Sequence, residues 1–173
     1  AGVFRSVNGG VNWTNITGSL PNRYVTDLTV NPNNSKEVIS TFGGFGTGHV
    51  FRSTNNGDAW TDITGNLPDV PHQSVVMDPL YTQNIYVGND LGTFVTTNGG
   101  TTWYEYRTGM PYALVFDLSI SYVNRKLRAT THGNGIWQRD LVQNPVSVSN
   151  PNTVVKNFKL YQNYPNPFNP STK

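Results

Sequence analysis

Repeated acidic positions are the part of this sequence that best fits acid–base chemistry. Asp27 and Asp117 hold matching positions in two short apolar segments, and Ser74 holds that position in the segment between them. Two carboxylates about 5–10 Å apart support hydrolysis of a glycosidic bond. The alternative is that each aspartate binds nearby backbone groups, and the sequence favours this structural role. Asp90 is a third candidate, but its setting within Gly88–Gly92 is more typical of a turn.

Other reactive chemistry has little support in the sequence. The three histidines, His49, His72 and His132, lack the paired spacing of zinc ligands. There is no cysteine, and no serine–histidine–aspartate arrangement can be identified. The net charge of +2 comes without a basic run. No apolar run approaches the roughly 18 residues of a membrane span. The sequence therefore predicts no metal site, no cofactor, no nucleic-acid partner and no membrane-spanning segment.

One short pattern occurs three times and must form the frame that positions these side chains. It consists of a hydroxyl residue, any residue, Asn, two turn residues, two variable residues and Trp. Asn and Gly provide the positive-φ positions of a tight hairpin, and the hydroxyl and Asn side chains can bind its backbone. We expect each Trp to be largely buried against its own hairpin. The residues with this structural role are Ser6, Asn8, Gly10 and Trp13, then Ser53, Asn55, Gly57 and Trp60, then Thr96, Asn98, Gly100 and Trp103.

The repeat extends beyond the hairpin. Phe4, Phe51, Phe94 and Trp137 precede it at equivalent positions and are spaced 47, 43 and 43 residues apart. This period is typical of a four-stranded propeller blade. The sequence therefore predicts an all-β fold for residues 1–141, a partial β-propeller of four-stranded antiparallel blades. It contains about two complete and two partial blades, with no helix.

Loops that join blades, and loops that join the second and third strands of a blade, form one face of a propeller, where ligands bind. We expect this face to be the ligand-binding surface. Arg23 and Gln73 also lie on this face. The residues expected to bind the ligand are Tyr24, Phe45, His72, Asn89, Asp90, Tyr112, His132 and Asn134. Aromatic rings can stack on a sugar, and amide groups can hydrogen-bond to it.

The hairpin pattern resembles the Asp-box, or bacterial neuraminidase repeat (BNR), whose form is Ser-x-Asp-x-Gly-x-x-Trp; here Asn replaces Asp in all three copies. The resemblance implies a sortilin-like β-propeller. The family includes sialidases, sortilin-type receptors, xyloglucan-hydrolysing propellers and photosystem-assembly factors, so it indicates fold more strongly than function. The arginine cluster and Tyr-Glu pair of sialidases are not recognisable. Arg5 and Arg52 flank hairpins instead, and Glu37 and Glu105 lack the expected context.

The composition changes near residue 142. Residues 142–156 are rich in Asn, Ser, Pro and Val and are predicted to form a linker. Within residues 157–173, the run Leu160–Thr172 reads Leu-Tyr-Gln-Asn-Tyr-Pro-Asn-Pro-Phe-Asn-Pro-Ser-Thr. This run resembles the start of the C-terminal sorting domain of the type IX secretion system. The resemblance implies the type IX machinery as a partner and a secreted protein, or one on the outer-membrane surface of a Gram-negative-type bacterium.

Three functions fit these observations. The favoured one is a secreted or cell-surface module that binds a glycan or an extracellular protein. The second is part of a glycoside hydrolase, xyloglucanase-like or sialidase-like, whose catalytic residues lie mostly outside this chain. The third is a scaffold repeat without a ligand. Because residue 1 falls within a repeat, we expect the chain to be the C-terminal part of a larger protein.

Overall fold

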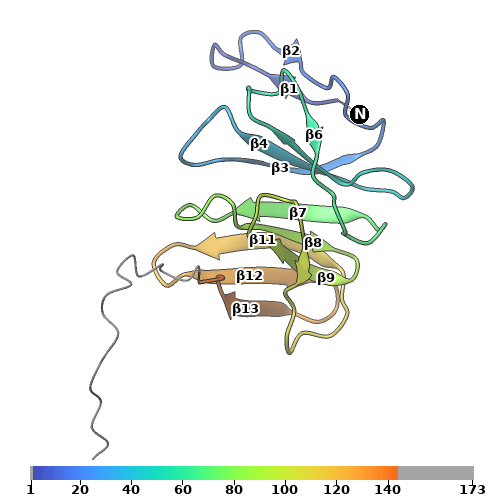
Figure 1. Ribbon diagram of the computed structural model, residues 1–173, viewed down its shortest axis with the longest axis vertical. Coiled ribbons are helices and arrows are strands. Elements are labelled where there is room, and N and C mark those ends of the chain that lie inside the picture. The colour runs from blue at the N-terminus through green and yellow to red at the C-terminus, as the bar shows by residue number, and fades with distance from the viewer. Residues whose placement is uncertain (1, 144–173) are drawn as a thin grey trace, which may run out of the picture. The chain divides into compact units, whose positions relative to one another are not determined.

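Thirteen β-strands and no helix make up residues 2–143, the part of the chain that the computed structural model describes. They form four antiparallel sheets, which we call blades A to D (Figure 1). Blade A contains β1 (Phe4–Arg5) and β2 (Thr14–Asn15). Blade B contains β3 (Val25–Val30), β4 (Val38–Phe42), β5 (Val50–Ser53) and β6 (Thr61–Asp62). Blade C contains β7 (His72–Met77), β8 (Ile85–Asn89), β9 (Gly92–Thr96) and β10 (Tyr104–Glu105). Blade D contains β11 (Val115–Ser121), β12 (Lys126–Thr131) and β13 (Ile136–Asp140).

The predicted all-β repeat of four-stranded antiparallel sheets is confirmed. In blades B and C each strand pairs with its neighbour in the sequence. The spaced aromatic residues occupy equivalent third strands, because Phe51 lies opposite Ser40 and Trp137 lies opposite Ala129 in the same register. Phe94 lies opposite Val87 in the same way.

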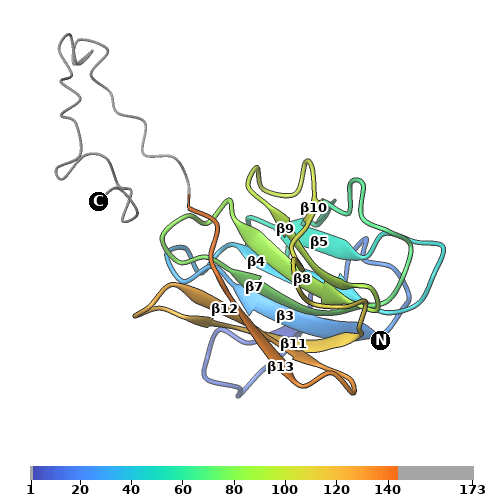
Figure 2. The same ribbon diagram turned by 90° about the horizontal axis from the view of Figure 1, so that it is seen from below.

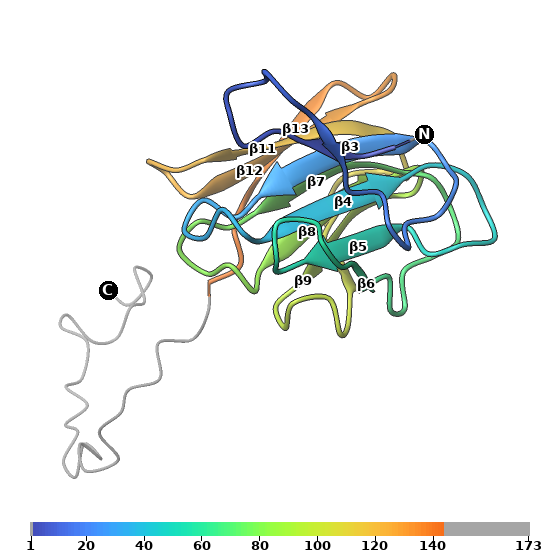
Figure 3. The same ribbon diagram turned by 90° about the horizontal axis from the view of Figure 1, so that it is seen from above.

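The apolar core lies between the blades. The first strand of blade C, β7, contacts the first strands of blades B and D, β3 and β11 (Figures 2 and 3). The central strands β4 and β8 are buried along their whole length, because both faces of each sheet are covered by a neighbouring blade. One cluster accordingly joins Ile39 and Val50 of blade B to Ile85 and Phe94 of blade C.

The three hairpins share one hydrogen-bond pattern, as the sequence predicted. In the second copy the Ser53 hydroxyl accepts bonds from the Asn55 and Gly57 N–H groups at 3.3 and 2.8 Å, and the Asn55 side chain accepts one from Ala59 N–H at 2.9 Å. Asn56 and Gly57 have positive φ angles of 62° and 87°. The loop between β5 and β6 is wider than the tight hairpin predicted from the sequence, and these side-chain bonds hold it together.

The hairpin tryptophans do not all have the expected environment. Trp60 and Trp103 are only 8% and 2% exposed, but their indole N–H groups bind the preceding blade, at the carbonyls of Ile16 and Ile63. Trp13 is 63% exposed and binds only the Gly10 carbonyl of its own hairpin. Burial therefore depends on a preceding blade, and the described residues contain none before blade A.

The predicted linker and sorting segment lie outside the described residues, apart from Val142 and Gln143. The Val142 N–H donates to the Tyr86 hydroxyl at 2.8 Å, and Leu141 is buried beside it in the cluster between blades C and D. Within residues 2–143 there is no helix long and apolar enough to cross a membrane.

Candidate functional site

A β-bulge interrupts each innermost strand at the same position. The register shifts between Val25 and Asp27, between His72 and Ser74, and between Val115 and Asp117. A bulge turns a side chain away from the regular alternation of a strand. The three bulged residues are Thr26, Gln73 and Phe116. Sequence analysis did not identify them as a set, although the matching Asp27, Ser74 and Asp117 lie next to them.

The predicted ligand-face residues fall into an exposed set and a buried set. Tyr24, Phe45 and Tyr112 are 82%, 60% and 64% exposed. His132 and Asn134 are also exposed, and Asp90 is half-buried. His72 and Asn89 are fully buried, so their side chains do not reach this surface.

Local contacts bring the exposed residues together within each blade. The Arg23 guanidinium donates to the Phe45 carbonyl at 3.3 Å, which places Tyr24 and Phe45 on neighbouring loops of blade B. In blade D the bulged Phe116 contacts His132 edge-on, with ring centroids 5.6 Å apart. In blade C the Arg107 guanidinium lies 3.6 Å from the centre of the Tyr112 ring. We call Tyr24, Phe45, Tyr112, Phe116 and His132 the aromatic loop face.

A pair of buried histidines lies between blades B and C. The rings of His49 and His72 stack with centroids 5.0 Å apart. His72 Nδ1 donates to the Val70 carbonyl at 2.8 Å, and Asn89 Nδ2 lies 3.3 Å from its other nitrogen. Burial lowers the pKa of His72 to about 4, so this imidazole is neutral at neutral pH.

The second histidine ties a glycine-rich loop to the next blade. His49 Nε2 lies 2.9 Å from Asp69 Oδ1, and both oxygens of Asp69 accept the Gly46 N–H, at 2.8 and 3.0 Å. The Gly46 N–H bond, with help from His49, lowers the pKa of Asp69 below 3.8 and keeps it ionised. Sequence analysis missed this pair. Asp69 aligns with the exposed Tyr112, since each follows the proline that ends a repeat.

Acidification will destabilise the protein between about pH 6.5 and pH 4. The unfolded chain protonates His72 near the ordinary pKa of 6.5, whereas the folded chain does so only near 4. The unfolded state therefore binds more protons in this window, and stability is lost as the pH falls. We expect a loss of about 2–3 kcal/mol in urea titrations between pH 7 and pH 4.

Two histidine variants test this assignment of the pH effect. His72→Gln should flatten the dependence of stability on pH. His132→Gln should leave it as in the wild type, since His132 is exposed. Equal slopes in all three proteins would show that His72 is not the titrating group.

The repeated carboxylates have different environments in blades B and D. Asp27 Oδ2 accepts the Ser74 hydroxyl at 3.0 Å and the Val75 N–H at 2.8 Å, so it fastens blade B to blade C. The Ser74 oxygen in turn accepts the Leu118 N–H of blade D at 3.1 Å. Asp117 holds the equivalent position in blade D but is exposed. These hydrogen bonds are consistent with the structural role that the sequence favoured for Asp27.

Ser74→Ala should cost about 1–3 kcal/mol of unfolding free energy, because it leaves the buried Leu118 N–H without its hydroxyl acceptor. Ser121→Ala is a matched control on the partly exposed end of β11 and should change stability by less than about 0.5 kcal/mol. Chemical denaturation of both variants measures the difference. Similar values would show that the bond to Ser74 does not link the blades.

Asp90 lies in a turn, as expected. The neighbouring Asn89 side chain accepts the N–H groups of Leu91 and Gly92 at 2.9 and 3.1 Å, and Gln73 Nε2 lies 3.4 Å from Asp90 Oδ1. Within residues 2–143, no group of three His, Cys, Asp or Glu side chains could hold a metal ion. The arrangement as a whole offers aromatic rings and hydrogen-bonding groups for binding.

Comparison with known proteins supports the fold. No protein-family model and no curated protein sequence matches the chain. An ancestral GH74 enzyme is similar in structure, with TM-score 0.61 and 24% identity over 75% of this chain. The GH74 enzyme of Niastella koreensis has TM-score 0.54 and 25% identity over 64%. The extracellular domain of a B. thetaiotaomicron protein, described as a one-component system, has TM-score 0.56 and 14% identity over 80%.

This chain spans only 19% of each of those three proteins. It has the fold of part of a β-propeller.

Proposed function

We propose that this chain is a β-propeller module that binds a glycan through the aromatic loop face. The observation that carries the proposal is the contrast between exposed aromatic rings and the hydrogen-bonded carboxylate of Asp27. Tyr24 and Phe45 present open rings on neighbouring loops of blade B, and Tyr112 is also exposed but carries the Arg107 guanidinium over its ring. Asp27, by contrast, is bonded to the backbone of the next blade. Open aromatic rings suit stacking against sugar rings, and such stacking binds a sugar without any catalytic group.

Affinity electrophoresis in gels that contain soluble β-glucans, xyloglucan among them, tests this proposal. We expect retardation of the wild-type chain by at least one polysaccharide, and its loss in a Tyr24→Ala, Phe45→Ala double variant. Tyr104→Ala is the matched control, because Tyr104 is equally exposed but lies on the outer strand β10. Retardation that survives the double variant, or that only Tyr104→Ala removes, would contradict the aromatic loop face as the site.

The second candidate is that the chain is part of a glycoside hydrolase. The structural similarity to two GH74 enzymes favours it. For this chain alone we expect no hydrolysis of β-glucans or sialosides, since the Asp27 carboxylate is engaged in hydrogen bonds to Ser74 and Val75. Turnover that Asp27→Asn or Asp117→Asn abolishes would replace the binding function with this one. An extracellular protein as ligand remains the alternative if no glycan binds.

The proposal also places the protein outside the cell. It rests on the resemblance of Leu160–Thr172 to a type IX sorting signal, and is consistent with the similarity in fold to an extracellular domain. Fractionation of a bacterium that has the type IX machinery tests it. Retention of the protein in the periplasm of a type IX mutant is the expected result, and unchanged export would contradict it.

A further inference from the structure

Asparagine followed directly by glycine is a chemically reactive pair, and this chain contains several copies of it. In such a pair the backbone nitrogen of the glycine can attack the side-chain amide carbon of the asparagine, because glycine has no Cβ to hinder the approach. The attack needs an asparagine side chain that is free to turn and a glycine nitrogen that is free of hydrogen bonds. The pairs are Asn8–Gly9, Asn56–Gly57, Asn98–Gly99 and Asn134–Gly135.

The hairpin of blade C holds its pair in an unreactive arrangement. The Gly99 N–H donates to the Gln83 carbonyl at 3.1 Å, and Gly99 is buried. The Asn98 side-chain oxygen accepts the Thr102 N–H at 3.0 Å and the Thr96 hydroxyl at 2.7 Å. Both reacting groups of this pair are therefore already engaged, and three hydrogen bonds must break before they can meet.

The other two hairpin pairs are engaged in part. In blade B the Gly57 N–H donates to the Ser53 hydroxyl at 2.8 Å, and Gly57 is buried. In blade A the Asn8 side-chain oxygen accepts the Asn12 N–H at 2.9 Å, but Gly9 is exposed and its N–H has no partner among residues 2–143. These two pairs are therefore intermediate in their restraint.

Asn134 has none of the restraints of the hairpin pairs. Asn134 and Gly135 are exposed in the loop between β12 and β13. Within the described part of the chain, the Gly135 N–H has no hydrogen-bond partner and the Asn134 side-chain oxygen accepts no bond. Asn134 Nδ2 lies 3.5 Å from the His132 carbonyl, which is at the outer limit for a hydrogen bond.

The backbone around Asn134 also has room to rearrange. Gly133 and Gly135 flank it with positive φ angles of 78° and 72°. Beyond the chain neighbours, no atom lies within 4 Å of the place that a Cβ would take at either glycine. At Gly99, by contrast, the Gln83 side chain occupies that place. The loop at Asn134 can therefore reach the conformation for attack without disturbing packed side chains.

We propose that Asn134 is a site of spontaneous deamidation. The Gly135 nitrogen forms a bond to the Asn134 side-chain amide carbon, the bond from that carbon to the amide nitrogen breaks, and ammonia leaves with the proton of the Gly135 N–H. The cyclic imide then takes up one water molecule and opens at either of its two carbonyls, which gives aspartate or isoaspartate. Water is the only co-reactant.

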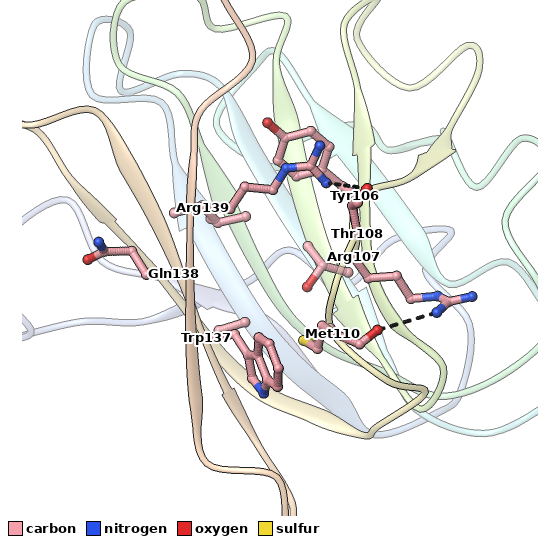
Figure 4. A pocket seen from close by; sticks show the side chains of 10 residues that line it. Tyr106, Arg107, Thr108, Met110, Trp137, Gln138 and Arg139 are labelled. Atoms are coloured by element: carbon pink, nitrogen blue, oxygen red, sulfur yellow. Dashed lines mark hydrogen bonds between the residues drawn. The ribbon is translucent and has the colours of Figure 1, made fainter. Parts of the chain in front are cut away.

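The modification changes the loop that carries His132 of the aromatic loop face, because it adds a negative charge there. Trp137, which lines a pocket between blades C and D, can report on it (Figure 4). Its indole N–H donates to the Asn134 carbonyl at 2.9 Å. In isoaspartate that carbonyl becomes part of a free carboxylate, so the NMR signal of the Trp137 indole N–H should shift. This inference does not depend on glycan binding.

Peptide mapping by mass spectrometry tests the proposal on the folded 173-residue chain, incubated in mildly alkaline buffer. We expect Asn134 to convert at least about tenfold faster than Asn98, since Asn98 must first lose three hydrogen bonds and each typical bond slows the reaction by a factor of several. Asn8 should fall between them. In guanidinium-unfolded chain the four pairs should convert at similar rates, because the restraints are gone.

Two variants separate the reaction from its protection. Asn134→Gln should abolish conversion at residue 134 and the shift of the Trp137 indole signal, because glutamine would have to close a larger ring. Thr96→Ala removes a hydroxyl that binds Asn98, so it should speed conversion at Asn98 and leave Asn134 unchanged. If Thr96→Ala fails to fold, the comparison of folded and unfolded wild-type chain still decides.

Three results would overturn the proposal. The first is equal conversion of Asn134 and Asn98 in the folded chain. The second is faster conversion of Asn8 than of Asn134. The third is an Asn134 that stays unmodified in the folded chain while the unfolded chain reacts, which would show that the loop between β12 and β13 is held more firmly than its contacts indicate.

Discussion

Replacement of Trp103 by alanine will lower the free energy of unfolding by about 3–5 kcal/mol, the range for truncation of a large buried side chain. Trp103 is 2% exposed, and its indole N–H binds the Ile63 carbonyl at 2.9 Å across the boundary between blades B and C. The substitution removes apolar contacts from both blades and leaves that carbonyl without its donor. Urea or guanidinium melts monitored by circular dichroism measure the effect.

Trp13→Ala is the matched control, since it changes the same position of the same hairpin pattern. Trp13 is 63% exposed and binds only the Gly10 carbonyl of its own hairpin. We expect a loss below about 1 kcal/mol, as for most surface substitutions. Equal losses for the two variants would mean that the hairpin itself, and not the boundary between blades, needs the tryptophan.

Arg125→Met will destabilise the protein by about 3 kcal/mol, because it leaves a buried carboxylate without its cation. Arg125 binds Asp78 through two nitrogens, at 2.6 and 2.7 Å, and the Asp78 side chain is fully buried. The pair joins the loop after β7 to the turn between β11 and β12. We place the cost at the lower end of the range for buried pairs because the Arg125 side chain is 29% exposed.

The adjacent residue provides the control. Lys126 pairs with Asp140 at 2.5 Å, but the two side chains are 30% and 66% exposed. Lys126→Met should therefore cost less than about 1 kcal/mol. In a double-variant cycle, Asp78→Asn should rescue part of the loss caused by Arg125→Met, because the buried charge is then gone. Absence of rescue would show that the arginine acts by packing alone.

The sequence by itself determined the period, the strand order and the internal structure of the hairpins. The spacing of Phe4, Phe51, Phe94 and Trp137 was enough to place four third strands in register. The bonds of Ser53 and Asn55 follow from residue type, since they join groups no more than four residues apart. These short-range bonds form in the same way in every copy of the motif, so the three copies made the hairpin structure predictable from the sequence.

Only the tertiary structure decided which copies of a residue are buried or bonded. Trp13 and Trp103 share one motif but differ in exposure, and Asp27 is bonded where the equivalent Asp117 is open. His72 follows a loop that the sequence placed on the surface, yet a neighbouring blade covers it. The physical reason is distance along the chain. The partners of Asp27 and Trp103 lie 40 or more residues away, and no local pattern reports whether such a partner is present.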